Sequence, residues 1–361
     1  MSGDGARNVA GSTPRANMAV RALTARADLN SDARFRPLAV SMKKIISLVI
    51  SLGLLAILYW KIDLTRLLPV FAGCDPLWMT LSLGMVVPIT LCTAWRLQQL
   101  LPRGGQLGFG EANRLILVAS VLNLVLPSKM GDIAKAWFMR DRGHLDGSLA
   151  LSLVVFEKAC DMLSLLLWCA FGLALYPRKD ALFWTMTFAV AAMLGAGMLL
   201  LGSTRFAHLF FGVAGRFAPG KAGAKFAKLG ASWSEMHSYF WESRARLLKV
   251  TGTSVFVWFL HLLQIWMFIL ALRASAPFLA NLALSPLAIL AGLLPLTFAG
   301  VGTRDAALVF FYAPYFPAPT AAALGLLCTT RYLLPALGGL PFAGEYLQMA
   351  KRNATPVSPE R

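Results

Sequence analysis

Charged residues are scarce in this chain. Only 14% of its 361 residues are charged, whereas 57% are hydrophobic, and the mean hydropathy is +0.63. The apolar residues form long blocks, without the one-sided spacing of surface helices or the alternation of half-buried strands. This composition excludes an ordinary soluble domain and predicts an all-α, polytopic helical membrane protein.

Acidic residues are scarcer than basic ones, with 17 Asp and Glu against 34 Lys and Arg and a net charge of +17. In a soluble chain this excess would suggest nucleic-acid binding. Here the basic residues cluster in short connections between apolar blocks, where they orient the protein and meet anionic lipid headgroups. We therefore expect membrane lipids as partners, and no nucleic acid.

The five cysteines show no metal-type spacing. Most of them lie in apolar segments, where cysteine behaves as a small core residue, so they do not indicate a disulfide framework. We expect neither a metal nor another cofactor.

The first 41 residues lack apolar periodicity and are rich in Ala, Arg, Ser, Gly and Asn. We expect residues 1–41 to be a disordered tail or a misassigned extension before Met42, with a transit-like segment as the alternative. Residues 42–350 then form the membrane domain.

Apolar blocks of about 16 residues or more are long enough to be membrane spans. Six blocks meet this length: 45–60, 77–95, 148–176, 181–202, 251–272 and 320–343. Two others, 115–127 and 285–298, are too short to cross. Each runs into a polar stretch with proline or glycine and then a second short apolar piece. We therefore interpret 115–139 and 285–316 as re-entrant helical hairpins.

The positions of Lys and Arg support this threading of the chain. With hairpins entering from opposite faces, one face of the membrane holds 17 of these residues and the other holds 5. The positive-inside rule then places both termini in the cytoplasm, with 203–250 as a cytoplasmic amphipathic loop and 351–361 as a cytoplasmic tail. The two halves share one order of elements in opposite orientations, which predicts an inverted repeat.

The tip of the first hairpin carries charge. We expect Gly131 and Asp132 to form a turn and an N-cap for a half-helix that begins at Ile133, with Lys129 and Lys135 beside it. Hydrocarbon cannot satisfy the free backbone groups of such a tip, so it must be buried in protein or line a wet cavity.

The tip of the second hairpin has a flexible loop with Gly300 and Gly302, followed by Thr303 as a candidate cap, Arg304, and Asp305 in the first turn. Two tips from opposite faces should meet near the midplane, each pointing a positive helix N-terminus at the centre. The sequence therefore predicts an anion site, and phosphate is the obvious candidate.

Charged residues also lie inside the expected span 148–176. Glu157 and Asp161 share one helix face, and Lys158 is placed to pair with Asp161. Two buried carboxylates repel, so one stays protonated unless a cation faces them. The candidates for this cation are Arg304, Lys129 and Arg331. The group is either an ion-pair network that locks the fold or a headgroup or proton-coupled site.

Three further features allow two interpretations each. Asn123 lines the same cavity or only bonds between helices. Arg96 is read as a snorkelling interface anchor rather than a binding residue, and residues 221–249 as an interfacial amphipathic helix or a loop helix packed under the bundle. Arg331, nearly in the middle of its span, is a candidate ligand for substrate.

Three ordered motifs resemble the transmembrane region of lysylphosphatidylglycerol synthases, a family whose small members are called flippase-like domain proteins. The motifs are N-L-V-L-P-S-K-M-G-D-I-A-K-A-W-F-M-R at 123–140, F-E-K-A-C-D at 156–161 and P-L-T-F-A-G-V-G-T-R-D at 295–305. The resemblance covers about residues 43–350. It marks as functional Asn123, Pro127, Gly131, Asp132, Glu157, Asp161, Gly300, Gly302, Arg304 and Asp305.

The chain departs from the family pattern at three positions. Lys158 stands where an arginine is usual, and Ala299 and Asp305 replace a glycine and a glutamate. The type of charge is kept at 158 and 305, so we expect the site to be intact. Which lipid headgroup it prefers is left open.

The resemblance implies a bacterial or archaeal protein that moves or modifies lipids, and we expect it in the bacterial cytoplasmic (inner) membrane. Full-length synthases carry a cytosolic domain that transfers lysine to phosphatidylglycerol. Because this chain ends at Arg361, shortly after the last span, we expect no lysyltransferase activity.

The leading hypothesis is a lipid translocase that holds the phosphate of an anionic, aminoacylated or polyprenyl-linked lipid at the midplane. One alternative is a membrane transferase that adds a glycosyl or aminoacyl group to a lipid. Another is an accessory subunit of a lipid-modifying enzyme encoded nearby. Whether the protein forms a homo-oligomer is left open.

Overall fold

The computed structural model describes residues 67–102, 107–125, 130–143, 145–176, 178–217, 230, 233–234, 236–293 and 302–354. Within these ranges the regular elements are all α-helices, which confirms the all-α fold. Four of the described helical segments are long and apolar enough to cross a membrane, as in a polytopic membrane protein. The expected tail 1–41, the expected span 45–60, and Pro127, Lys129 and Gly300 lie outside the described residues.

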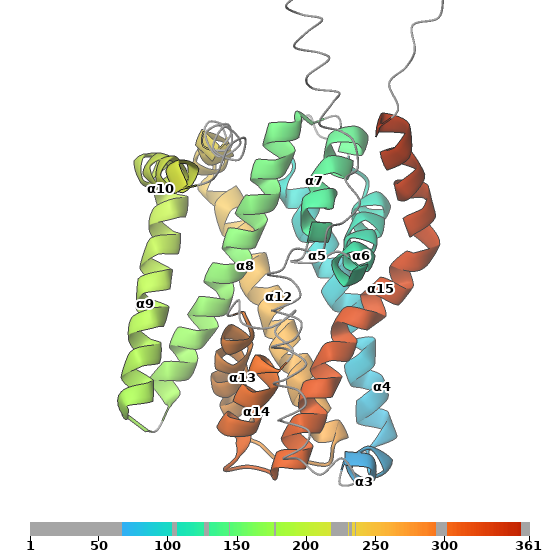
Figure 1. Cartoon of the computed structure of the whole chain (residues 1–361), viewed down its shortest axis with the longest axis vertical. Coiled ribbons are helices and arrows are strands. Elements are labelled where there is room, and N and C mark those ends of the chain that lie inside the picture. The colour runs from blue at the N-terminus through green and yellow to red at the C-terminus, as the bar shows by residue number, and fades with distance from the viewer. Residues whose placement is uncertain are drawn as a thin grey trace, which may run out of the picture.

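The long helices match the expected spans and run along the long axis of the molecule (Figure 1). They are α4 (Pro76–Gly84), continued by α5 (Val86–Leu100), α8 (Gly147–Leu175), α9 (Ala181–Gly202), α12 (Arg244–Ala271) and α15 (Ala318–Ala354). A short α3 (Leu67–Ala72) precedes them. The helix α15 runs past the expected end at 343 and contains Pro335 and Pro341 in its interior.

Polar caps explain where several of these helices begin. The carboxylate of Asp180 accepts a hydrogen bond from the amide of Phe183 at 2.9 Å and starts α9. Asp75 caps α4 in the same way, accepting from the amide of Leu77 at 2.9 Å. Each cap satisfies an amide that the first turn leaves free, so the polar residue between two apolar blocks fixes the boundary.

Two short helical hairpins lie in opposite halves of the bundle (Figure 1). They are α6 (Phe109–Val125) with α7 (Met130–Gly143), and α13 (Phe278–Gly292) with α14 (Thr303–Tyr312). These are the predicted hairpins, and their entry into the membrane from opposite faces stays a prediction. The helices begin earlier than the hairpin bounds expected at 115 and 285: α6 begins at Phe109 with Glu111 in its first turn, and α13 begins at Phe278.

The helix α15 lies against both hairpins, and two of its glycines make this possible. A methyl group on Gly325 would lie 2.6 Å from a carboxylate oxygen of Asp305 in α14. One on Gly339 would lie 2.6 Å from the carbonyl carbon of Leu117 in α6. Helices in membranes associate through such close backbone contacts at small residues. The two hairpins are therefore held by one shared helix.

Each hairpin has a hydrophobic core of its own. One cluster of buried residues surrounds α13 and α14 and includes Phe268 and Tyr312. A second cluster surrounds α6 and α7 and includes Leu115 and Met139. The division of the core agrees with a bundle of two halves, each built around one hairpin.

The expected amphipathic segment 221–249 is described only in part. Its residues Trp233, Met236 and Phe240 are fully buried in the core around α6 and α7. This agrees with a loop helix packed under the bundle, the second of the two readings, because the aromatic face is covered by protein and not by lipid.

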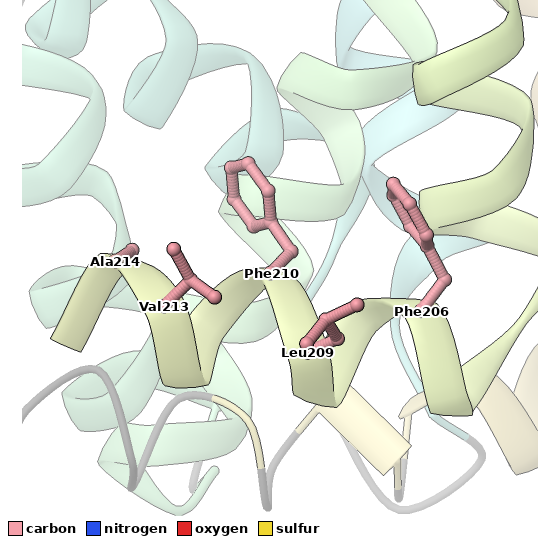
Figure 2. Close-up of a pocket in the computed structure, with 5 residues that line it drawn as sticks. All are labelled: Phe206, Leu209, Phe210, Val213 and Ala214. Atoms are coloured by element: carbon pink, nitrogen blue, oxygen red, sulfur yellow. The ribbon is translucent and has the colours of Figure 1, made fainter. Parts of the chain in front are cut away.

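The exposed amphipathic helix is instead α10 (Thr204–Phe217), which leaves the end of α9 at a steep angle (Figure 1). Figure 2 shows its apolar side chains Phe206, Leu209, Phe210, Val213 and Ala214, which line a shallow apolar groove. Arginines stand near both ends of the helix. An apolar face with basic ends is typical of a helix in the membrane interface.

We predict that Gly339→Ala lowers the thermal stability of the purified protein by several degrees. The new methyl group would overlap the backbone of Leu117 in α6, and such overpacking costs about 1–3 kcal/mol. The measurement is the midpoint of thermal unfolding in detergent.

The adjacent Gly338 provides a matched control. A methyl group there would make an ordinary 3.6 Å contact with the side chain of Leu117. Gly338→Ala gains the same helix propensity, about 0.5–1 kcal/mol, without the overlap, so it should be neutral or stabilising. Equal midpoints for the two variants would contradict the proposed contact between α15 and α6.

Candidate functional site

Charged side chains gather where α7 meets α5 and α8. We call this group the first-hairpin cluster. Its members are Arg96 on α5, Asp132 and Lys135 on α7, and Glu157, Lys158 and Asp161 on α8. From the sequence, Asp132 and Lys135 are expected at the hairpin tip and Glu157, Lys158 and Asp161 within a span; the structure joins the two groups and adds Arg96.

Arg96 is the centre of this cluster. It is only 2% exposed, and its guanidinium donates to Glu157 at 2.8 Å and to the hydroxyl of Ser254 on α12 at 3.1 Å. It also forms an ion pair with Asp161. The reading of Arg96 as an interface anchor was therefore wrong, because the helix turns this side chain toward the acidic face of α8 and away from the membrane surface.

Glu157 holds two cations from two different helices. One carboxylate oxygen accepts from Arg96 and the other forms an ion pair with Lys135, and all three side chains are nearly inaccessible. The sequence correctly required a cation to face the carboxylates, but the described structure supplies it from α5 and α7. Neither Arg304 nor Arg331 contacts Glu157 in the described residues, and Lys129 lies outside them.

Lys158 forms the accessible rim of the cluster. Its ammonium lies 3.1 Å from Asp132 on α7 and 3.6 Å from Asp161 on its own helix. The side chain is 45% exposed, in contrast to the buried centre. Three cations thus face three anions, so the cluster as a whole is electrically neutral.

The start of the first hairpin differs from the expected geometry. The helix α7 begins at Met130, so Gly131 and Asp132 lie inside its first turn and do not form a cap before Ile133. Gly131 is the point of closest approach to α6, since a methyl group there would lie 2.6 Å from the amide nitrogen of Asn123. The oxygen of the Asn123 side chain is buried and has no hydrogen-bond partner among the described residues.

A second group, the second-hairpin cluster, lies at the start of α14. The guanidinium of Arg304 donates to Asp305 at 2.7 Å, to the carbonyl oxygen of Gly325 at 2.9 Å and to the hydroxyl of Thr329 at 2.8 Å. Both charged side chains are buried. The positive charge of Arg304 is therefore already balanced, and its donors are engaged by α15.

The cap of α14 is also shifted by one residue from the expected position. Gly302, with a φ of 102°, is the residue before the helix, and its amide donates to Asp305 at 3.1 Å. Thr303 is the first helical residue and not the cap. A positive φ is readily adopted only by glycine, which explains the residue type at 302.

The two clusters do not form one clamp. In the part of the chain that the structure describes, no hydrogen bond or ion pair joins the first-hairpin cluster to the second-hairpin cluster. Arg331 belongs to neither cluster. It is 7% exposed, and one of its terminal nitrogens donates to the hydroxyl of Tyr332 at 3.2 Å. The described residues thus contain two neutral clusters and a separate buried arginine, and the expected phosphate site between the two tips stays a prediction, because Pro127, Lys129 and Gly300 lie outside them.

Arg96 and Ser254 are the residues that sequence reasoning missed. Arg96 follows a long apolar run, as an interface anchor does. A signal was present: Leu97, Leu100 and Leu101 continue the apolar pattern beyond it, and all three are buried. Ser254 gave no signal, because a serine in an apolar helix commonly bonds only to its own backbone.

We predict that Glu157→Gln strongly destabilises the protein. The change leaves Lys135 without its counter-charge and weakens the pairing of Arg96, and breaking a buried ion pair costs about 3–5 kcal/mol. Removing the lysine as well, in Glu157→Gln with Lys135→Met, should recover part of the loss. The measurement is a double-mutant cycle on the unfolding midpoint in detergent.

Glu345→Gln is the control for this cycle. Glu345 pairs with Arg142 at the exposed end of the bundle, and its side chain is 52% exposed. Such pairs contribute about 0–1 kcal/mol, so the variant should unfold close to the wild type. A loss as small for Glu157→Gln as for Glu345→Gln would contradict the central role of Glu157.

Comparison with known proteins identifies the family of the chain. The family model for the lysylphosphatidylglycerol synthase TM region matches residues 44–339, which contain both clusters and Arg331. The UPF0104 membrane protein MJ1595 of Methanocaldococcus jannaschii is 23% identical over 318 residues, covering 82% of this chain and 93% of that protein. The resemblance drawn from the three motifs is confirmed. This multi-pass membrane protein, related to lipid handling, belongs to the lysylphosphatidylglycerol synthase TM region family.

Proposed function

We propose that the protein is a lipid translocase of the bacterial cytoplasmic membrane, with both termini in the cytoplasm. Its substrate is an anionic, aminoacylated or polyprenyl-linked phospholipid whose phosphate is held within the bundle. Membership in a lipid-handling family supports the class of substrate. The finer assignment rests on how the charges and hairpins are arranged.

The observation that carries the proposal is the half-exposed rim of the first-hairpin cluster. Lys158 lies near the middle of α8, a helix long enough to span a membrane, and it keeps 45% of its side chain accessible. Charge within a span is costly in hydrocarbon, so accessible charge there indicates a wet cavity or a passage for polar groups. A lipid headgroup is the polar group that a lipid-handling protein must pass.

The rim also connects two parts that would have to move. Lys158 joins α8 to the first turn of α7 through Asp132, whereas the buried pair of Glu157 and Lys135 holds the same two helices deeper inside. A headgroup phosphate competes with Asp132 and Asp161 for the ammonium of Lys158. Exchange of these partners would let the start of the hairpin open while the buried pair keeps its place.

The arrangement of the hairpins supports alternating access. The first hairpin lies in one half of the bundle and the second in the other, and both contact α15 (Figure 1). Inverted halves that rock against each other expose a central site to one face at a time. A shared helix such as α15 would couple the opening of one hairpin to the closing of the other.

The test is reconstitution into vesicles that contain a fluorescent lipid. The panel consists of phosphatidylglycerol, an aminoacylated phosphatidylglycerol and a polyprenyl phosphate, and loss of fluorescence to an added reductant reports movement to the outer leaflet. We expect wild-type protein to accelerate the movement of at least one of them several-fold over protein-free vesicles. No acceleration for any of the three lipids would refute the proposal, and so would product formation from a labelled sugar or aminoacyl donor without lipid movement.

Lys158→Gln is the informative variant in this assay. We expect it to slow lipid movement several-fold while it costs less stability than Glu157→Gln, because the lysine is half-exposed. Arg142→Gln, which removes a partly exposed charge paired with Glu345 and Glu111, should move lipid like the wild type. Equal rates for the two variants would remove Lys158 from the pathway.

A further inference from the structure

One buried charge lacks a counter-charge in the part of the chain that the structure describes. The charged side chains that are less than 9% exposed in the described residues are Arg96, Lys135, Glu157, Arg304, Asp305 and Arg331. All but the last are held in ion pairs with partners in the described structure. Two guanidinium nitrogens of Arg331, Nε and Nη1, have no hydrogen-bond partner among the described residues.

An unpaired buried arginine is energetically unfavourable. Desolvation of a charge costs several kcal/mol unless an opposite charge or a full set of hydrogen bonds compensates it. The same chain compensates Arg96 with two carboxylates and Arg304 with one. A fixed cation with free donors in a membrane protein therefore indicates a counter-ion that is brought by a ligand.

The position of Arg331 is central in the bundle. It lies on α15 between Gly325, which touches the start of α14, and Gly339, which touches α6. With a rise of about 1.5 Å per residue, it is about 9 Å from the first contact and about 12 Å from the second. A ligand held there sits between the two hairpins.

The surroundings of Arg331 favour an anion over a cation. His261 on α12 is within electrostatic reach of Arg331 and Arg96, and its Nδ1 atom is buried without a hydrogen-bond partner in the described residues. Cys328, one turn before Arg331, is under the influence of Arg331 and also of Arg304 and Asp305, whose charges balance each other. The neighbouring ion pairs in the described residues are thus neutral, and the charge of Arg331 is the one that an anion would balance.

One hydrogen bond of Arg331 leads to the outer side of α15. Its Nη2 atom donates to the hydroxyl of Tyr332, a side chain that is 41% exposed. The exposed leucines Leu333, Leu337 and Leu340 point away from the helix face that carries Arg331. Tyr332 is thus the contact that links the buried cation to the side of the helix where the chains of a lipid would remain in the bilayer.

We propose that Arg331 binds the phosphate of an anionic lipid headgroup, with His261 as a second polar contact, at a site between the two hairpins. The planar guanidinium presents parallel N–H donors that match two phosphate oxygens. This deepens the proposed function by assigning the phosphate to Arg331, two of whose guanidinium nitrogens have no partner among the described residues, rather than to Arg304 and the hairpin tips. Binding itself does not depend on translocation, so the two are separable by experiment.

The test is lipid binding to the purified full-length protein in detergent. Phosphatidylglycerol, diacylglycerol with the same acyl chains and inorganic phosphate are the three probes, and the readouts are the unfolding midpoint and native mass spectrometry. We expect phosphatidylglycerol to raise the midpoint and to remain bound, and diacylglycerol to do neither. If inorganic phosphate protects as well as the lipid does, the site holds a free anion and the lipid assignment is wrong.

Two substitutions at Arg331 distinguish a role of its charge in lipid binding from a role in folding. Arg331→Gln should weaken the binding of phosphatidylglycerol about tenfold or more, since hydrogen bonds to charged groups are the strong ones. Arg331→Lys keeps the charge but loses the planar guanidinium with its parallel donors. Its affinity for phosphatidylglycerol should lie between those of Arg331→Gln and the wild type. The control is Arg114→Gln, which removes an exposed guanidinium that stacks over the ring of Phe342.

The outcomes distinguish this inference from the proposed function. If Arg331→Gln binds phosphatidylglycerol as the wild type does while vesicles with wild-type protein still move lipid, the assignment of the binding site to Arg331 is refuted and the proposed translocase function is not. If binding depends on Arg331 but no lipid moves, the binding site at Arg331 is supported and the proposed translocase function is refuted. Should Arg331→Gln fail to fold, binding by Arg331→Lys that equals the wild type would overturn the proposal of a bidentate phosphate contact.

Discussion

The pairing of Glu157 with Arg96 and Lys135 is the constraint on which the rest of the first half depends. A carboxylate inside a membrane bundle must be neutralised, and here the cations come from two other helices. The hydroxyl of Ser254 adds α12 to the same network. One buried carboxylate therefore fixes the relative positions of α5, α7, α8 and α12, and the packing of α6 follows because α7 and α6 touch at Gly131.

The second half follows the same physical logic with other residues. Arg304 is neutralised by its neighbour Asp305 and then bonds to α15 through the carbonyl oxygen of Gly325 and the hydroxyl of Thr329. Each hairpin is thus tied to the long helices by charge at its second helix. The helix α15 touches both hairpins through glycine, so a change at one hairpin can reach the other through a single rigid element.

The balance of charge separates structural from ligand-binding roles. In the described residues the two hairpin clusters are neutral and most of their donors are engaged within them, the Nε atom of Arg96 excepted, as expected of groups that hold helices together. Lys158 differs because it is half-exposed, and Arg331 because two of its guanidinium nitrogens and its charge have no partner among the described residues. A polar group that crosses the bundle would meet these two cations without breaking the buried pairs, which is how a membrane protein can be both stable and open to a lipid headgroup.

The sequence by itself determined the class of the protein, the long helices, the two short hairpins and the charged motifs, because apolar block length, proline and glycine positions and embedded charges are local properties. It could not decide which cation faces Glu157, since Arg96 lies 61 positions away in the chain and looked like an interface anchor. Nor could it show that Arg304 is paired with Asp305 while Arg331 has no ion pair among the described residues. Those outcomes depend on which helix faces meet, and only the tertiary structure brings α5, α7 and α8, or α14 and α15, into contact.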